Sequence, residues 1–199
     1  MTLVEKIKII RNLPESSKIR ASELVYEAFQ KKINSVIKEK EKAIRIITKS
    51  INYSAGFYAV YENSLVGMAG TQSKGNRFIK VKFSYFHEEY GFFKALIKKI
   101  YFNFDSLGTI KKDELELTAL SVQKEMRWKK IGTKLINNII LYAKSRGFKK
   151  LILTVVDTNP LAKKLYETIG FIRYKTKNYG FLTRSAGFKE VTHMVKNLN

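Results

Sequence analysis

The spacing of apolar residues changes several times along the chain, and each change predicts an element. Near the N-terminus, apolar and basic residues alternate in "KIKIIRNL", a pattern typical of a strand. Two segments with helical spacing follow, "ASELVYEAFQKKINSVI" and "EKAIRIITKSI". Their apolar faces are expected to be Leu24, Ala28 and Phe29 in the first and Ile44, Ile47 and Ile51 in the second.

The middle of the chain reads first as strands and then as a helix. "GFYAVYENSLVGMAGTQ" predicts two strands around a polar turn at Asn63 and Ser64, and "NRFIKVKFSYF" suggests a third strand. In "YGFFKALIKKIYFNF" aromatic and aliphatic residues occupy one half of a helical wheel and lysines the other half, which predicts a basic amphipathic helix at about 91–102. The segment "ELELTALSV" then predicts a strand.

The last third of the chain alternates between strands and helices. "TKLINNIILYAKSRG" predicts a helix that buries Leu135, Ile139 and Ala143 and stops at Gly147. The β-branched run "KKLILTVVD" is typical of a strand buried on both faces. "NPLAKKLYETIG" predicts a helix with Asn159 as its cap, and "FIRYKT" predicts a further strand. A helix that joins the first two of these strands favours a parallel pair.

Composition indicates a folded domain with a strong positive charge. The chain has 199 residues, 45% of them hydrophobic, which favours one domain over residues 1–199. Because there is no cysteine, disulfides and a catalytic thiol are excluded. Since the first residues lack a signal-peptide pattern and no apolar run reaches about 18 residues, we expect a soluble, cytoplasmic protein.

The net charge of +21 leaves the partner open. It results from 38 Lys and Arg against 17 Asp and Glu, spread along the chain. Such a charge attracts polyanions such as nucleic acid, ribosomes or phosphorylated cofactors, or it reflects composition alone. The two histidines, His87 and His193, are too far apart in the sequence to suggest a metal pair, so no metal site is expected.

The segment "RWKKIGTKL" lies between a predicted strand and a predicted helix, where proteins often bind phosphate. The first amides of a helix have no intrahelical partner, and the helix dipole favours an anion there. Arg127, Lys129, Lys130 and Lys134 would add charge, and Gly132 would allow close approach of a ligand. A basic surface turn is the alternative, and Trp128 fits either role.

Three segments together resemble the GNAT superfamily of N-acetyltransferases: "LTALSV", "RWKKIGTKL" and "NPLAKKLYETIGF", within residues 115–175. The loop of that superfamily reads Gln/Arg-x-x-Gly-x-Gly/Ala. Arg127 matches its first position and Gly132 its last, whereas Lys130 replaces the middle glycine. The tail "GFKEVTHMVKNL" and the segment at about 88–110, expected to be a basic-aromatic helical insertion, resemble a bacterial subgroup of these proteins.

The resemblance implies an α/β fold and acetyl-CoA as the acetyl donor. The expected architecture is a mixed central sheet with helices on both faces and a splayed, parallel pair of fourth and fifth strands. The backbones of Leu120 and Val122 would pair with the pantetheine arm, and Asn159 and Tyr166 would lie beside it. The residues implied around the pyrophosphate are Arg127, Lys129, Lys130, Ile131, Gly132 and Thr133.

The resemblance also implies direct transfer of the acetyl group to a primary amine in a ternary complex. A backbone amide of the fourth strand would stabilise the oxyanion, and the hydroxyl of Tyr166 would act as the acid toward the leaving thiolate. Glu116 is the candidate base, or else a solvated strand residue, since Thr118 occupies a position where related sequences often carry an acid. Tyr166 is otherwise a core aromatic.

Several alternatives remain open at this point. The basic helix at about 91–102 packs on its own domain, binds a partner or a membrane, or borders the acceptor site or a homodimer contact. The protein is alternatively a nucleic-acid or ribosome-binding protein, although no helix-turn-helix or RNA motif supports that. A third alternative is a GNAT fold that binds CoA without catalysis.

Overall fold

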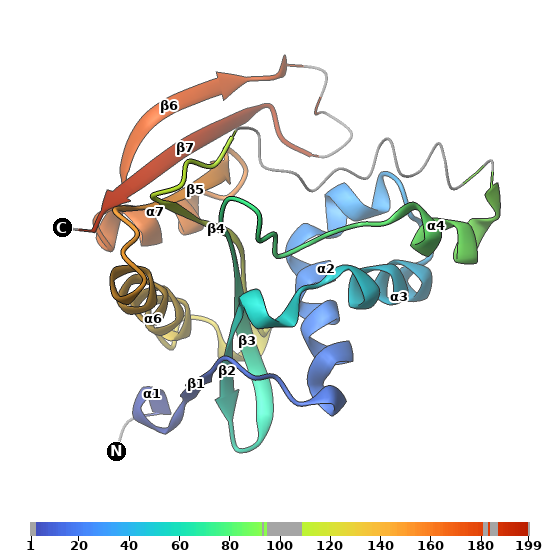
Figure 1. The fold of residues 1–199 in the computed structure, drawn as a ribbon, viewed down its shortest axis with the longest axis horizontal. Helices are drawn as coiled ribbons and strands as arrows, with labels where there is room; N and C mark the ends of the chain where they lie inside the picture. The colour runs from blue at the N-terminus through green and yellow to red at the C-terminus, as the bar shows by residue number, and fades with distance from the viewer. Residues whose placement is uncertain (1–2, 93, 95–108, 181–182, 184–186, 199) are drawn as a thin grey trace.

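The fold is organised around one seven-stranded sheet (Figure 1). The computed structural model describes the chain apart from residues 1–2, 93, 95–108, 181–182, 184–186 and 199. The strands are β1 (Lys8–Ile10), β2 (Gly56–Tyr61), β3 (Ser64–Gln72), β4 (Glu114–Val122), β5 (Lys150–Val156), β6 (Ile172–Asn178) and β7 (Glu190–Asn197). Their spatial order is β1-β2-β3-β4-β5-β7-β6, and of these pairs only β4 and β5 are parallel.

Helices cover both faces of this sheet, as predicted. The helices are α1 (Leu3–Lys6), α2 (Lys18–Asn34), α3 (Lys40–Ser50), α4 (Phe83–Tyr90), α6 (Ile131–Ser145) and α7 (Pro160–Thr168), with short 3₁₀ turns η1 (Glu15–Ser17), η2 (Tyr53–Ala55) and η3 (Lys124–Met126). Figure 1 shows α2 and α3 on one side of β3 and β4, and α6 and α7 on the other. Each side has its own core of buried apolar residues.

The predicted helices α2, α3 and α6 form, but their buried faces differ in part from the prediction. Helix α6 buries Leu135, Ile139 and Ala143 as expected. In α2, Leu24 is buried together with Ala21 and Val25, whereas Ala28 is exposed. The helix has non-helical backbone angles at Phe29, and Ile33, beyond this kink, is buried in the same core as Leu24.

Four further predictions about elements are wrong or incomplete. The segment expected to be a third strand, residues 76–86, forms no strand: its last four residues begin α4, which buries Phe86, and Ile79 makes one isolated bridge to Ile51. The hairpin turn lies at Glu62 and Asn63, whose φ values of 47° and 62° match a two-residue turn with left-handed residues. Strand β5 is buried on one face only. The sequence analysis missed β7, which lies between β5 and β6.

Strands β4 and β5 pair over a short stretch and then part. Residues 114–117 of β4 pair with residues 150–153 of β5, and β4 continues to Val122 without further pairing to β5. On its other side β4 has a bulge, since Leu117 pairs with Thr71 and Ala119 with Gly70, while Thr118 is skipped. The Thr118 hydroxyl donates to the Gly70 carbonyl at 3.1 Å. The splayed parallel pair predicted from the sequence is therefore present.

The segment at about 88–110, predicted as a helical insertion, lies largely outside the described residues. Its first residues belong to the end of α4, which stops at Gly91 with a φ of 71°.

Candidate active site

The loop before α6 has an unusual backbone at two of its residues. Trp128 and Lys130 both have left-handed conformations, with φ values of 64° and 56°. Lys130 is the N-cap residue of α6, and its side chain makes no capping hydrogen bond. Lys130 therefore adopts a conformation that glycine reaches without steric cost, at the position where the GNAT loop has its middle glycine.

The first turn of α6 presents free amides beside this loop. The backbone N–H groups of Ile131, Gly132 and Thr133 have no intrahelical acceptor, because they belong to the first turn. There is no acidic residue in this turn to compete for them. The positive end of the helix dipole and these three donors together make a site suited to an anion.

The basic side chains of the loop do not all face that site. The Nε of Arg127 donates to the carbonyl of Val122 at 3.1 Å, which holds the start of the loop against the end of β4. The Nζ of Lys129 lies 3.6 Å from the sulfur of Met126. Lys134, predicted to add charge to the loop, instead donates to the carbonyls of Val4 and Ile7, each at 2.6 Å, and so holds the N-terminal segment.

Gly132 lies where the three sequence motifs meet. A Cβ atom at this position would lie 3.4 Å from Leu165 of α7 and 3.8 Å from Leu120 of β4. These are ordinary contact distances, so the loop, the second helix and the fourth strand are packed together at the start of α6. The predicted CoA-binding residues on β4, the loop and α7 thus share one side of the sheet.

Asn159 performs the structural role predicted for it. Its side-chain oxygen accepts a hydrogen bond from the amide of Ala162 at 3.2 Å and caps α7, with Pro160 at the first helical position. The side-chain amide nitrogen remains available, since the cap uses only the oxygen.

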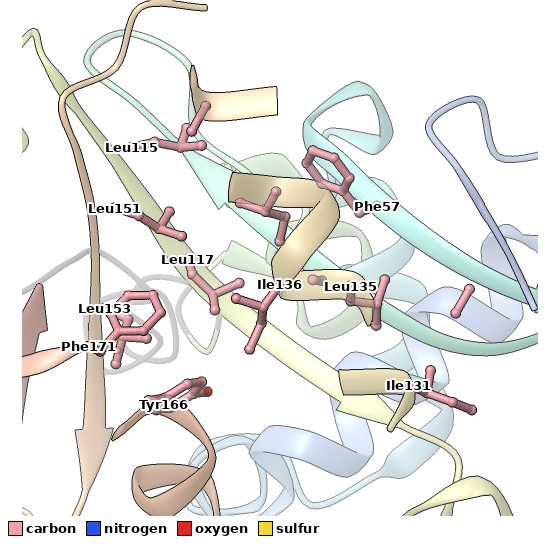
Figure 2. Close-up of a cluster of buried hydrophobic side chains, with 14 of the residues drawn as sticks. Phe57, Leu115, Leu117, Ile131, Leu135, Ile136, Leu151, Leu153, Tyr166 and Phe171 are labelled. Carbon is pink, nitrogen blue, oxygen red and sulfur yellow. The ribbon is translucent and has the colours of Figure 1, made fainter. Parts of the chain in front are cut away.

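Tyr166 lies in the core between the diverging strands. Its ring packs edge-on against Phe171, with centroids 5.9 Å apart, and the residue is only 7% exposed. Figure 2 shows the ring beside Leu153 and Phe171, with its hydroxyl directed away from Phe171. Burial raises the pKa of Tyr166 to about 12, so the hydroxyl keeps its proton at neutral pH. It makes no hydrogen bond within the part of the chain that the structure describes.

Glu116 lies on the opposite face of the sheet from Tyr166. Leu115 and Leu117 point into the core that contains Tyr166, and Glu116, between them, points the other way. Glu116 is only 5% exposed, so the alternative of a solvated strand residue is wrong. Its carboxylate accepts a hydrogen bond from the Gln72 Nε2 at 3.0 Å.

A pocket of about 470 Å³ opens on this face, and we call it the sheet pocket. Side chains from β4, β5, β6 and β7 line it, and it reaches Leu153, where β5 parts from β4. Residues that line it include Glu114, Glu116, Ile152, Thr154, Tyr174 and His193. The outward residues of β5 that were expected to be buried face this pocket.

Sequence reasoning missed His193 as a pocket residue. It is 8% exposed, its ring centroid lies 5.9 Å from that of Tyr174, and its Nε2 is buried without a hydrogen-bond partner among the described residues. Alternation in "EVTHMV" was the available signal, because it places His193 on the face opposite the apolar Met194.

Neither a metal cluster nor a membrane span is found in the described parts of the chain. Within those residues, His, Asp and Glu side chains nowhere gather in a group of three or more that could hold a metal ion. The helices found there are all too short or too polar to cross a membrane.

Comparisons with known proteins agree with this geometry. The stretch matched in the probable N-acetyltransferase camello of Xenopus laevis is 46% identical over 59 residues, 30% of this chain and 27% of that protein. The stretch matched in N-alpha-acetyltransferase 30 of Schizosaccharomyces pombe is 30% identical over 77 residues, 39% of this chain and 51% of that protein. The matched stretches thus span between about a quarter and a half of these curated relatives.

Solved structures and a family model extend the match to most of the chain. An N-acetyltransferase from Staphylococcus aureus Mu50 has the same fold, with a TM-score of 0.69 at 20% identity over 95% of this chain and 100% of that one. The model of the acetyltransferase (GNAT) family matches residues 22–171, from α2 to the end of the α7 motif. The chain belongs to the acetyltransferase (GNAT) family.

Proposed function

We propose that the protein transfers the acetyl group of acetyl-CoA to a primary amine, directly and within a ternary complex. One observation carries this proposal. The gap where β4 and β5 part has Tyr166 and the loop before α6 on one face, and the sheet pocket with Glu116 on the other. A donor can therefore enter from one face and an acceptor from the other, and the two meet between the strands.

In this proposal the loop and the first turn of α6 bind the pyrophosphate of CoA. The amides of Ile131, Gly132 and Thr133 donate to it, and those of Lys129 and Lys130 lie next to them in the chain. The left-handed backbone at Lys130 supports this assignment, since it reproduces the local shape of a glycine. Arg127 and the two lysines supply positive charge at the mouth of the site.

The pantetheine arm extends from there into the gap between the strands. Leu120 and Val122 lie on the part of β4 that is not paired with β5, so their backbone groups on that side are open to a ligand. The amide nitrogen of Asn159, which the helix cap does not use, is placed at the end of β5 and can donate to the arm.

The groups that transfer protons lie on the two faces of the gap between β4 and β5. The neutral amine attacks the thioester carbon, and an amide near the bulge at Thr118 stabilises the oxyanion. Collapse of the oxyanion then breaks the C–S bond, and the Tyr166 hydroxyl, which its raised pKa keeps protonated at physiological pH, gives its proton to the leaving sulfur. Glu116 accepts the amine proton from the side of the sheet pocket, and Gln72 orients its carboxylate.

The wider setting of this activity is also proposed. Residues 1–199 act as one domain, the site of action is the cytoplasm, and no metal takes part in the transfer. The net charge of +21 favours contact with nucleic acid or ribosomes, whereas a homodimer is proposed only from the segment at about 88–110.

Release of free CoA thiol on mixing acetyl-CoA with a panel of primary amines tests the proposal. We expect turnover with at least one amine, lowered about tenfold or more in Tyr166→Phe and in Glu116→Gln, with unchanged affinity for acetyl-CoA. Binding of acetyl-CoA without turnover on any amine would favour a non-catalytic fold. Salt-sensitive binding of RNA or DNA without binding of acetyl-CoA would favour the nucleic-acid alternative.

A further inference from the structure

We propose that the sheet pocket selects primary amines that carry an anionic group at their far end. This inference rests on the proposed function, because it names the class of acceptor for the same site. It follows from the order of charges across the pocket, because both of its carboxylates lie on β4, whereas β6 contributes two lysines and no carboxylate to the lining.

The carboxylate wall belongs to β4, next to the point where β4 and β5 part. Glu114 and Glu116 are 9% and 5% exposed, which is unusual for carboxylates on a chain with a net charge of +21. Glu114 accepts a hydrogen bond from the amide of Lys111 at 3.0 Å, and Glu116 accepts one from Gln72. An ammonium group that approaches the gap would lie beside these two carboxylates.

The lysine wall belongs to β6, on the far side of the same pocket. Lys175 and Lys177 line it there, separated from β4 by β5 and β7. Three strand spacings separate the backbones of β4 and β6 by about 14 Å, and long side chains from both walls narrow the space between them. A small acceptor of extended shape can therefore meet both walls at once.

Two aromatic residues of the pocket lining, His193 on β7 and Tyr174 on β6, respond to these charges. The pKa of His193 is lowered, first by burial and then by the positive charges of Lys177 and Lys175. The pKa of Tyr174 is raised, first by burial and then by the negative charges of Glu114 and Glu116. Both kinds of charge therefore act on side chains that line the pocket.

The buried Nε2 of His193 is a second sign of a binding wall. A buried polar nitrogen without a partner is rare in folded proteins and costs free energy. Lys111 and Lys150, which lie next to Glu114, also line the pocket, so its lining holds four lysines against two glutamates. A polyamine would meet repulsion there, whereas an amine with a carboxylate or phosphate would match both walls.

A matched series of acceptors tests this inference. δ-Aminovalerate, its amide and cadaverine share a primary amine and a similar chain, and their far ends are anionic, neutral and cationic. We expect kcat/KM to be highest for the acid, about tenfold lower for the amide and lower still for cadaverine. Equal values for the three acceptors, or a preference for cadaverine, would overturn the inference.

Lysine variants locate the origin of the preference. In Lys175→Ala/Lys177→Ala the advantage of the acid over the amide should shrink about tenfold, mainly through KM for the acid. Lys6→Ala/Lys8→Ala removes the same charge at the opposite edge of the sheet, where Lys8 begins β1, and should leave the preference unchanged. Equal effects of the two double variants would overturn the inference.

Calorimetric titration with acetyl-CoA separates this inference from the proposed function. Both double variants are expected to bind acetyl-CoA as the unmodified protein does. Absence of acetyl-CoA binding in the unmodified protein would refute the proposed function itself. Binding and turnover with the wrong order of acceptors would refute only the charge selection.

Discussion

Replacing Lys130 by glycine should stabilise the protein, although it removes a side chain. Lys130 has φ 56° and ψ 14°, and a left-handed conformation costs a residue with a Cβ atom about 1–2 kcal/mol. Glycine avoids that cost but loses about 0.5–1 kcal/mol more backbone entropy on folding. The difference predicts that Lys130→Gly raises the free energy of unfolding by about 0.5–1 kcal/mol.

Lys129→Gly is the matched control, since it removes the same side chain and charge one residue earlier. Lys129 is not among the described residues with a positive φ, so glycine there brings only its entropic cost. We expect this variant to lose about 0.5–1 kcal/mol. Urea unfolding of both variants should therefore separate them by about 1–2 kcal/mol, which corresponds to several degrees in Tm for a chain of this length.

The same two variants measure what the Lys130 side chain contributes to CoA binding. Each variant loses one exposed positive charge, so we expect affinity for acetyl-CoA to fall by no more than about fivefold in both. Equal destabilisation by the two glycines would refute the left-handed backbone at Lys130. Loss of binding in Lys130→Gly alone would show that the ammonium group, rather than the backbone shape, is required.

Three further changes test neighbouring parts of the site. Asn159→Ala should cost about 1 kcal/mol through loss of the cap on α7, whereas Asn159→Asp should keep stability, and urea unfolding compares the two. Gln72→Leu should cost about 1.5–3 kcal/mol in the same assay, because it removes a hydrogen bond to the buried Glu116. The pKa of Tyr166 is higher in the folded than in the unfolded protein, so the neutral hydroxyl stabilises the fold fully below about pH 10 and this stabilisation is lost toward about pH 12. Between these two pH values the free energy of unfolding should fall by about 2–3 kcal/mol more in the unmodified protein than in Tyr166→Phe.

The sequence predicted best those elements whose signals are local. The cap at Asn159, the proline after it and the stop at Gly147 each act within one turn of a helix, and all three predictions hold. Strand β4 was predicted with its observed bounds because its apolar residues alternate over its first half. The parallel pairing of β4 and β5 was predicted from the helix that joins them, and the family motifs imply the same pairing.

Errors arose where tertiary contacts decide the outcome. Aromatic residues at the end of "NRFIKVKFSYF" favour a strand by propensity, yet "FSYF" begins helix α4, which buries Phe86 in the core it shares with α2 and α3. The run in β5 resembles a strand covered on both faces, but one of its faces lines the sheet pocket. Pairing of β7 between β5 and β6 is a long-range event that spacing in the sequence does not report.

In the site too, residues carried by local motifs could be predicted, whereas features that depend on tertiary contacts could not. Gly132 and Tyr166 could be predicted because the motifs carry them on adjoining elements. The pocket around Glu116 could not be predicted, because it depends on β7 and brings His193 beside Tyr174 from distant parts of the chain. For the left-handed backbone at Lys130, the residue type gives no signal, and the only indication in the sequence is that Lys130 stands where the GNAT loop has its middle glycine.

Calorimetric titration of the unmodified protein with acetyl-CoA, followed by addition of primary amines and a reading of free thiol, tests the central claim most directly. We expect one binding site per chain with a Kd in about the micromolar range, and thiol release only when an amine is present. Absence of binding at about tens of micromolar, or thiol release that does not depend on the amine, would contradict it.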